Sequence, residues 1–226
     1  TPIPKQSKRW LHFRGGLKFG VNKIEIDKKL KEILKKGTLI HLAEGGKYTG
    51  MTKTIKKKLI PHGLGFAQWS NSHSYKGQWK EGKFHGWGNY TSPDDYEYSG
   101  LWKNNHMSGY GELIRSNGDV YKGEFKNSSM HGEGIYTVPG ILRREGIFKD
   151  NESNGKGKTT YLKDYDQHEK GEVREGNFKD GRWHGNFKIT YADGEVLKAK
   201  YNMGVNVENK KKWREKRHQK KLIKIM

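Results

Sequence analysis

The sequence predicts an all-β protein, an elongated single-layer antiparallel meander of β-hairpins with a short N-terminal helix and a basic C-terminal helix. Three observations lead to this prediction. Glycines recur at fixed intervals, side-chain character alternates with a period of two between them, and only 31% of the residues are hydrophobic, with a mean hydropathy of -1.06. Such a chain has too little apolar material for a thick core, which favours a thin or extended fold.

Two series of glycines run through the chain in step. Their members are spaced 23 residues apart, with one interval of 30: Gly63, Gly86, Gly109, Gly132, Gly155 and Gly185 in the first series, and Gly77, Gly100, Gly123, Gly146 and Gly176 in the second. A fixed period of this length is typical of repeat proteins. Because both series slip by the same seven residues, the extra length is predicted to form a surface loop between Tyr161 and Arg174.

Each repeat has the pattern of a β-hairpin. Tyr75, Gly77 and Trp79 alternate with polar residues and therefore share one face of a strand, and a second strand follows after the short turn "EGKF". The pairs Asn117-Gly118 and Asp193-Gly194 favour tight turns between hairpins. Hairpins joined in series in this way make an antiparallel meander.

The recurring glycines in strand interiors need a structural reason, because glycine normally weakens a strand. Close packing of an aromatic ring from the adjacent hairpin supplies one. The rings expected to lie over glycines are those of Trp79, Trp102, Phe125, Phe148 and Phe178.

The stretch "YKGQWKEGKFHGWG", residues 75–88, resembles the MORN repeat (membrane occupation and recognition nexus), whose pattern is approximately Y-x-G-x-W-x-x-G-x-x-H-G-x-G. The resemblance covers residues 48–204 and implies a non-catalytic repeat scaffold. The departures from the pattern are Ser108 and Asn154 at the His position, Arg144 and Arg174 at the Tyr position, and Leu197 and Ala199 in a degenerate last half-unit.

The pattern divides the chain into three parts. Residues 1–37 form a basic extension with an amphipathic helix over 24–36, because Ile26, Leu30, Ile33 and Leu34 fall at helical spacing. Residues 38–205 form the repeat sheet, and residues 206–226 form a basic helix. Either helix is suited to cap an open sheet edge.

Fifteen of the twenty net positive charges lie within residues 1–37 and 206–226. Such blocks repel themselves unless an anionic partner neutralises them. The residues expected to contact this partner are Lys5, Lys8, Arg9, Arg14, Lys210, Lys211, Lys212, Arg214, Lys216, Arg217, Lys220 and Lys221. RNA, anionic phospholipid and acidic protein surfaces all remain open as the partner.

No residue pattern predicts catalysis, a metal or a cofactor. His62, His85, His131 and His184 belong to neighbouring hairpins about 10 Å apart, too far for one metal ion, and are expected to bond to backbone in turns. "NGKGKTT", residues 154–160, lacks the first glycine of a phosphate-binding loop. The chain has no cysteine, and no apolar run is long enough to span a bilayer.

Trp10, Trp69 and Trp213 lie outside the repeat pattern and are the aromatic residues expected to contact a partner. The sequence favours a scaffold subunit of a large assembly that docks other protein subunits and takes no small-molecule substrate. A membrane-surface adaptor and an accessory domain of an enzyme are the alternatives. A first segment without acidic residues before Glu25 favours a mitochondrial location, with cilium or cytoskeleton as the alternative.

Overall fold

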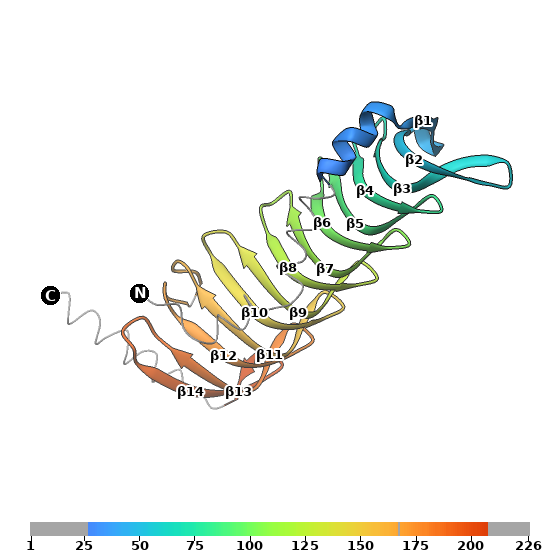
Figure 1. Cartoon of the computed structure of the whole chain (residues 1–226). Coiled ribbons are helices and arrows are strands. Elements are labelled where there is room, and N and C mark those ends of the chain that lie inside the picture. The colour runs from blue at the N-terminus through green and yellow to red at the C-terminus, as the bar shows by residue number, and fades with distance from the viewer. Residues whose placement is uncertain (1–26, 167, 208–226) are drawn as a thin grey trace. The chain divides into compact units, whose positions relative to one another are not determined.

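The computed structural model describes residues 27–166 and 168–207. Residues 27–36 are helical, and fifteen strands follow in one open antiparallel sheet whose strand order is the chain order. The elements after the helix are β1 (Thr38–His41), the short 3-10 helix η1 (Ala43–Gly45), β2 (Lys47–Ile55), β3 (Lys58–Gln68), β4 (Ser74–Lys80), β5 (Lys83–Ser92), β6 (Tyr96–Lys103), β7 (His106–Arg115), β8 (Val120–Lys126), β9 (Ser129–Val138), β10 (Leu142–Lys149), β11 (Glu152–Tyr161), β12 (Val173–Lys179), β13 (Arg182–Thr190), β14 (Val196–Asn202) and β15 (Val205–Asn206). The predicted hairpin meander is confirmed (Figure 1). The predicted C-terminal helix lies outside the described residues from 208 onwards.

The chain divides into two compact units. The first extends to Gly118 and includes Lys122–Ser128, and the second comprises Asp119–Tyr121 and the residues from Ser129 onwards. Each unit is built from hairpins of the same kind, whose residues on one face are buried while the alternate residues are exposed, as in Tyr75, Gly77 and Trp79 of β4.

The first unit is organised around a row of glycines that face one another across its strands. Cα atoms of consecutive members are partners in the strand register: Gly50, Gly65, Gly77, Gly88, Gly100 and Gly111. The rings of Tyr48, Tyr75 and Tyr98 lie against this row and are fully buried. A Cβ atom built on Gly77 would lie 2.9 Å from the Tyr75 hydroxyl oxygen. These positions therefore require glycine because there is no space for a side chain.

The expectation that Trp79 and Trp102 cover glycines of the adjacent hairpin is wrong. Gly65 and Gly88 are covered instead by Tyr48 and Tyr75, each from the same hairpin as the glycine that it covers. The two indole Nε1 groups instead donate hydrogen bonds to the carbonyls of Gly65 and Gly88 in the preceding hairpins, at 3.3 and 3.1 Å. A bulge between Gly77 and Trp79 offsets the tryptophan from the glycine row. The Trp79 ring consequently packs edge-on between Tyr48 and Tyr75, with centroids 5.2 and 5.0 Å away.

The second unit continues the same scheme with different rings. Gly134, Gly146, Gly157 and Gly176 are successive register partners. Tyr121 covers Gly134 and Phe187 covers Gly176. Phe178 lies against Gly157, which confirms the prediction for this ring. Phe148 and Phe125 pack edge-on against Tyr121 and Tyr98 within their respective units. Leu197 and Ala199, from the degenerate half-unit, are buried in the last hydrophobic cluster with Phe178 and Phe187.

The two arginines at tyrosine positions of the repeat are accommodated differently. Arg174 is 1% exposed and its Nε donates to the carboxylate of Glu172, which is fully buried. Its guanidinium also lies 4.2 Å from the centroid of the Trp183 ring. Arg144 bonds instead to the hydroxyls of Thr159 and Ser153, at 3.1 and 3.4 Å.

The extra loop between the two arginine positions lies where the glycine spacing predicts it. It connects Tyr161 at the end of β11 to Val173 at the start of β12. Besides Glu172, it contributes His168, whose ring stacks on Tyr161 with centroids 4.0 Å apart and whose Nδ1 lies 3.3 Å from Glu172 Oε1. The longer connection therefore brings a counter-charge to the buried guanidinium of Arg174.

The helix over residues 27–36 confirms the helical prediction for the part of it that the structure describes. Leu30 is fully buried, and the Asp27 carboxylate forms an ion pair with Lys76 of β4 at 2.6 Å. The other end of the helix leads into β1, whose register partner is β2. The outer edge of the sheet is thus formed by β1, and the helix extends from β1 to β4. None of the helices in the described ranges is both long and apolar enough to traverse a bilayer.

Candidate functional site

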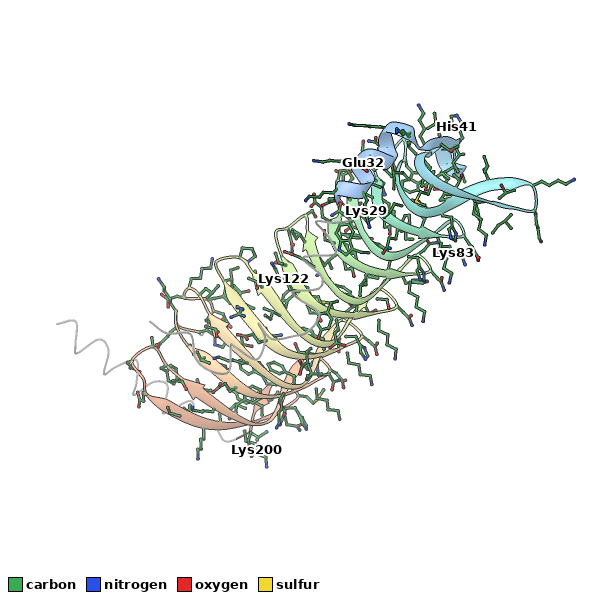
Figure 2. The ribbon with its side chains drawn as sticks, in the orientation of Figure 1. Lys29, Glu32, His41, Lys83, Lys122 and Lys200 are labelled. Atoms are coloured by element: carbon green, nitrogen blue, oxygen red, sulfur yellow. The ribbon has the colours of Figure 1, made fainter. Side chains whose placement is uncertain are left out.

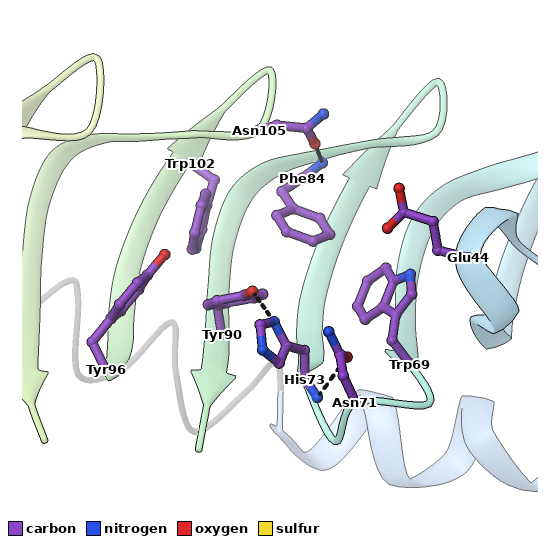
Figure 3. A pocket seen from close by; sticks show the side chains of 9 residues that line it. All are labelled: Glu44, Trp69, Asn71, His73, Phe84, Tyr90, Tyr96, Trp102 and Asn105. Atoms are coloured by element: carbon purple, nitrogen blue, oxygen red, sulfur yellow. Dashed lines mark hydrogen bonds between the residues drawn. The ribbon is translucent and has the colours of Figure 1, made fainter. Parts of the chain in front are cut away.

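A groove lined by aromatic side chains opens on the first unit (Figure 3). Its volume is about 330 Å³. We call it the aromatic groove, and its lining residues are Glu44, Trp69, Asn71, His73, Phe84, Tyr90, Tyr96, Trp102 and Asn105. These residues come from η1, the β3–β4 turn, strands β5 and β6 and the β6–β7 turn, so consecutive hairpins each contribute to one surface.

The rings of the groove contact one another mostly edge to face. Phe84 is central, with ring centroids 6.2 Å from Trp69 and 5.3 Å from Trp102, and it stacks on the buried Tyr75 at 3.8 Å. Tyr90 lies 5.6 Å from Tyr96 in a tilted arrangement. Trp102 is 6% exposed, whereas Trp69, Phe84, Tyr90 and Tyr96 are only half-buried. The partly exposed rings therefore form a ready-made apolar surface on a rigid base.

Hydrogen bonds fix the positions of these rings. His73 Nδ1 lies 2.7 Å from the Tyr90 hydroxyl, and the backbone N–H of Phe84 donates to Asn105 Oδ1 at 2.7 Å. Burial, the neighbouring Tyr90 hydroxyl and the charge of Asp95 raise the pKa of Tyr96 to about 12. Burial and Asp95 also raise the pKa of Tyr90. Both phenols are therefore neutral near pH 7 and retain the ability to donate a hydrogen bond.

Two carboxylates flank the groove. Glu44 extends from η1 toward the space beside Phe84 and Trp69 in Figure 3, and its backbone has a positive φ of 58°. Asp95, in the β5–β6 turn, acts electrostatically on both Tyr90 and Tyr96. Both carboxylates are exposed, and among the described residues neither forms an ion pair. The aromatic surface is thus bordered by negative charge without a cation from this part of the chain.

Of the residues that the sequence proposes as partner contacts, Trp69 lies in the groove. Trp10 and Trp213 lie outside the described residues, as do all twelve lysines and arginines proposed to contact an anionic partner. Phe84, Tyr90 and Tyr96 were not predicted as site residues. The signal for them is a comparison between repeats, since Phe84 and Tyr90 occupy the positions of Met107 and Leu113 one repeat later.

A second surface feature is a line of exposed lysines on the hairpin turns of the first unit. We call it the tip lysine row, and its members are Lys56, Lys57, Lys58, Lys80, Lys83, Lys103 and Lys126. Lys83 marks this edge in Figure 2. Glu81 is the acidic residue among these turns, and it pairs with Lys53 at 3.8 Å. The corresponding turns of the second unit mix Lys149 and Lys179 with Asp150 and Asp180.

The repeat histidines do not form a metal site. In the described ranges 27–166 and 168–207, no group of three or more His, Asp or Glu residues is placed to hold a metal ion. His62 Nδ1 accepts a hydrogen bond from the backbone N–H of Glu81 at 3.4 Å, as expected. The expectation fails for His85, His131 and His184, whose buried Nδ1 atoms have no hydrogen-bond partner within the described part of the chain. The stretch 154–160 lies within β11, and no loop for a phosphate is formed there.

Hairpins in series, a central row of paired glycines and aromatic rings packed against that row define a single-sheet repeat protein. A family model described as MORN repeat matches the chain at residues 75–95, 98–120, 121–139, 145–161 and 175–196. The chain belongs to the MORN-repeat proteins. The comparison with curated proteins found no significant relative. Among solved structures, the TCP domain of SAS-4 (dCPAP) from Drosophila melanogaster, in complex with a proline-rich motif of Ana2 (dSTIL), is similar with 10% identity, a TM-score of 0.40, and coverage of 74% of this chain and 90% of that chain.

Proposed function

We propose that the protein is a non-catalytic scaffold subunit of a larger assembly, and that the aromatic groove is its docking surface for another protein. The observation that carries this proposal is the groove itself. Four half-buried rings, Trp69, Phe84, Tyr90 and Tyr96, stand beside one another on a rigid sheet, and such rings are the residues that dominate binding energy at protein interfaces.

The polar groups of the groove support a role in binding rather than in catalysis. His73 is held by the Tyr90 hydroxyl, and its Nε2 lies 3.5 Å from Ser92 Oγ, so the imidazole is engaged on both sides. The two tyrosines with raised pKa remain neutral donors. These groups are arranged to orient a bound segment by hydrogen bonds around an apolar centre.

The tip lysine row supports a second contact, with an anionic partner. Neighbouring hairpin turns lie about 10 Å apart, two strand spacings, so the lysines present a regular series of positive charges. This row adds to the basic residues at both ends of the chain. RNA is the partner we propose for this surface, because extended polyanions gain affinity from every phosphate that a lysine neutralises. Anionic phospholipid is the competing partner.

Co-purification with matched variants tests both contacts. Trp69→Ala combined with Tyr96→Ala is expected to lower the recovery of specific partner proteins at least about tenfold, because two central anchor residues are truncated. Leu101→Ala, an exposed apolar residue on the opposite face of β6, should leave them bound. Lys56→Gln, Lys57→Gln and Lys58→Gln together should reduce the recovery of RNA and leave the partner proteins unchanged.

Circular dichroism of each variant verifies that the sheet is intact. Recovery of the same proteins with the groove variant and the wild type would contradict the docking role. If the wild type instead recovers anionic lipid and the lysine variant does not, the tip lysine row binds a membrane surface and not RNA.

A further inference from the structure

We infer that the aromatic groove is occupied by the chain's own first segment, residues 1–26, when no partner protein is bound. This inference rests on the proposed docking role of the groove and adds its regulation. The segment lies outside the described residues, and the case for it comes from the chemistry of the groove, the composition of the segment and the point at which the described chain begins.

The charges of the groove and the segment are complementary. Glu44 and Asp95 border the groove and have no cationic partner among the described residues. Residues 1–26 contain one acidic residue, Glu25, and six lysines and arginines: Lys5, Lys8, Arg9, Arg14, Lys18 and Lys23. A cation beside an aromatic ring gains a further favourable interaction with the ring face. The groove therefore suits a basic segment better than an acidic or neutral one.

The apolar content of the segment also matches the groove. Trp10, Phe13 and Phe19 are interspersed with the basic residues, in the stretch "KRWLHFRGGLKF". Trp10 is one of the three tryptophans outside the repeat pattern, and another of them, Trp69, lies in the groove. If the Trp10 ring packs among the groove rings, the neighbouring Arg9 and Arg14 lie near the carboxylates of Glu44 and Asp95.

The described chain begins close enough for the segment to reach. Asp27 is held by Lys76 of β4, which alternates with Tyr75 and therefore lies on the face opposite the groove, so the segment must pass around the ends of the strands to enter it. The groove residues on β6 are two strand spacings, about 10 Å, further along the sheet. An extended segment of 26 residues spans up to about 90 Å, so reach does not limit it. Tethering raises its effective concentration to about the millimolar range, which makes even weak contacts sufficient.

The consequence is competition at the groove. A partner protein must displace the segment, and its apparent affinity is lowered by the fraction of chains whose groove is filled. The segment released by such a displacement would expose its six cations. Docking at the groove and anion binding by the N-terminal segment are thereby coupled.

Crosslinking from a single engineered thiol tests the inference in the full chain. Because the chain contains no cysteine, Asn71→Cys creates one thiol at the groove for benzophenone maleimide, and Leu101→Cys creates a control thiol on the opposite face. Illumination of a mixture of 15N-labelled and unlabelled chains, followed by peptide mapping, identifies the crosslinked residues. We expect crosslinks from position 71 to residues 1–26 of the same chain, and no such crosslinks from position 101.

Charge reversal provides the second readout. Glu44→Lys with Asp95→Lys should lower the yield of these crosslinks at least about threefold, since attraction becomes repulsion. Glu81→Lys, the same change at the opposite edge, should leave the yield unchanged. Self-occupancy would be overturned if position 71 crosslinked to another copy of the chain or to residues 208–226, or if it formed no crosslink to the chain. Loss of partner proteins in the Trp69→Ala, Tyr96→Ala variant would still uphold the docking role in that case, so the two proposals fail separately.

Discussion

Gly100→Val is expected to destabilise the first unit by at least about 3 kcal/mol, because the new side chain has no space on either side. A Cβ atom at this position would stand 2.7 Å from the Cα atom of Gly111 and would overlap the Tyr98 ring. Tyr98 is fully buried, and its hydroxyl donates to the carbonyl of Leu101 at 3.0 Å, so the ring has little freedom to move. The urea midpoint measured by circular dichroism should fall sharply.

Lys103→Ala is the matched control for this substitution. Lys103 lies on the same strand and is exposed, and its replacement should change the free energy of unfolding by less than about 0.5 kcal/mol. Small and equal effects from both substitutions would show that the glycine row does not determine the packing of the hairpins.

Glu172→Gln is expected to destabilise the second unit by about 3 kcal/mol, because it leaves the Arg174 guanidinium buried without a counter-charge. Glu175→Gln is the control, since the Glu175 carboxylate is 3.9 Å from Lys188 at the surface and contributes less than about 1 kcal/mol. Adding Arg174→Met to Glu172→Gln should recover part of the loss, because both charges are then removed.

The same pair gives the protein a pH dependence. Burial opposes ionisation of Glu172, but the hydrogen bond from His168 and the charge of Arg174 together hold its pKa below its ordinary value of 4.5. A lowered folded-state pKa means that the unfolded state binds the proton more tightly. The stabilisation is therefore complete above the unfolded pKa and is lost as the pH falls below it. Glu172→Gln should flatten the loss of stability below about pH 4.5, and an unchanged acid profile would contradict this role.

The repeat period of the sequence is enough to predict the hairpins. It is not enough to predict which of two aromatic residues on the same strand face packs against the glycines. Tyr75 and Trp79 share one face of β4, and the pattern does not say which ring reaches the glycine row. The bulge between Gly77 and Trp79 decides it, and this bulge depends on the pairing with β5. The departure at Arg174 was visible in the sequence, whereas its partner Glu172 belongs to a loop whose path only the fold defines.

The groove was predictable only in part, for a similar reason. Trp69 stands out because it lies outside the repeat, but Phe84 and Tyr90 belong to variable positions within it. At the same two positions, the next hairpins carry Met107 and Leu113, and a later hairpin carries Ser153 and Thr159 around Arg144. The chemistry of the aromatic face therefore changes along the sheet while the glycine row stays constant.

Crosslinking within the native assembly tests the central claim, that the aromatic groove is the surface that docks another protein. The Asn71→Cys chain labelled with benzophenone maleimide is assembled with its natural partners and illuminated, beside the Leu101→Cys chain. We expect crosslinks from position 71 to a partner protein, with a matching fall in crosslinks to residues 1–26. Partner crosslinks that arise from position 101 and are absent from position 71 would contradict it.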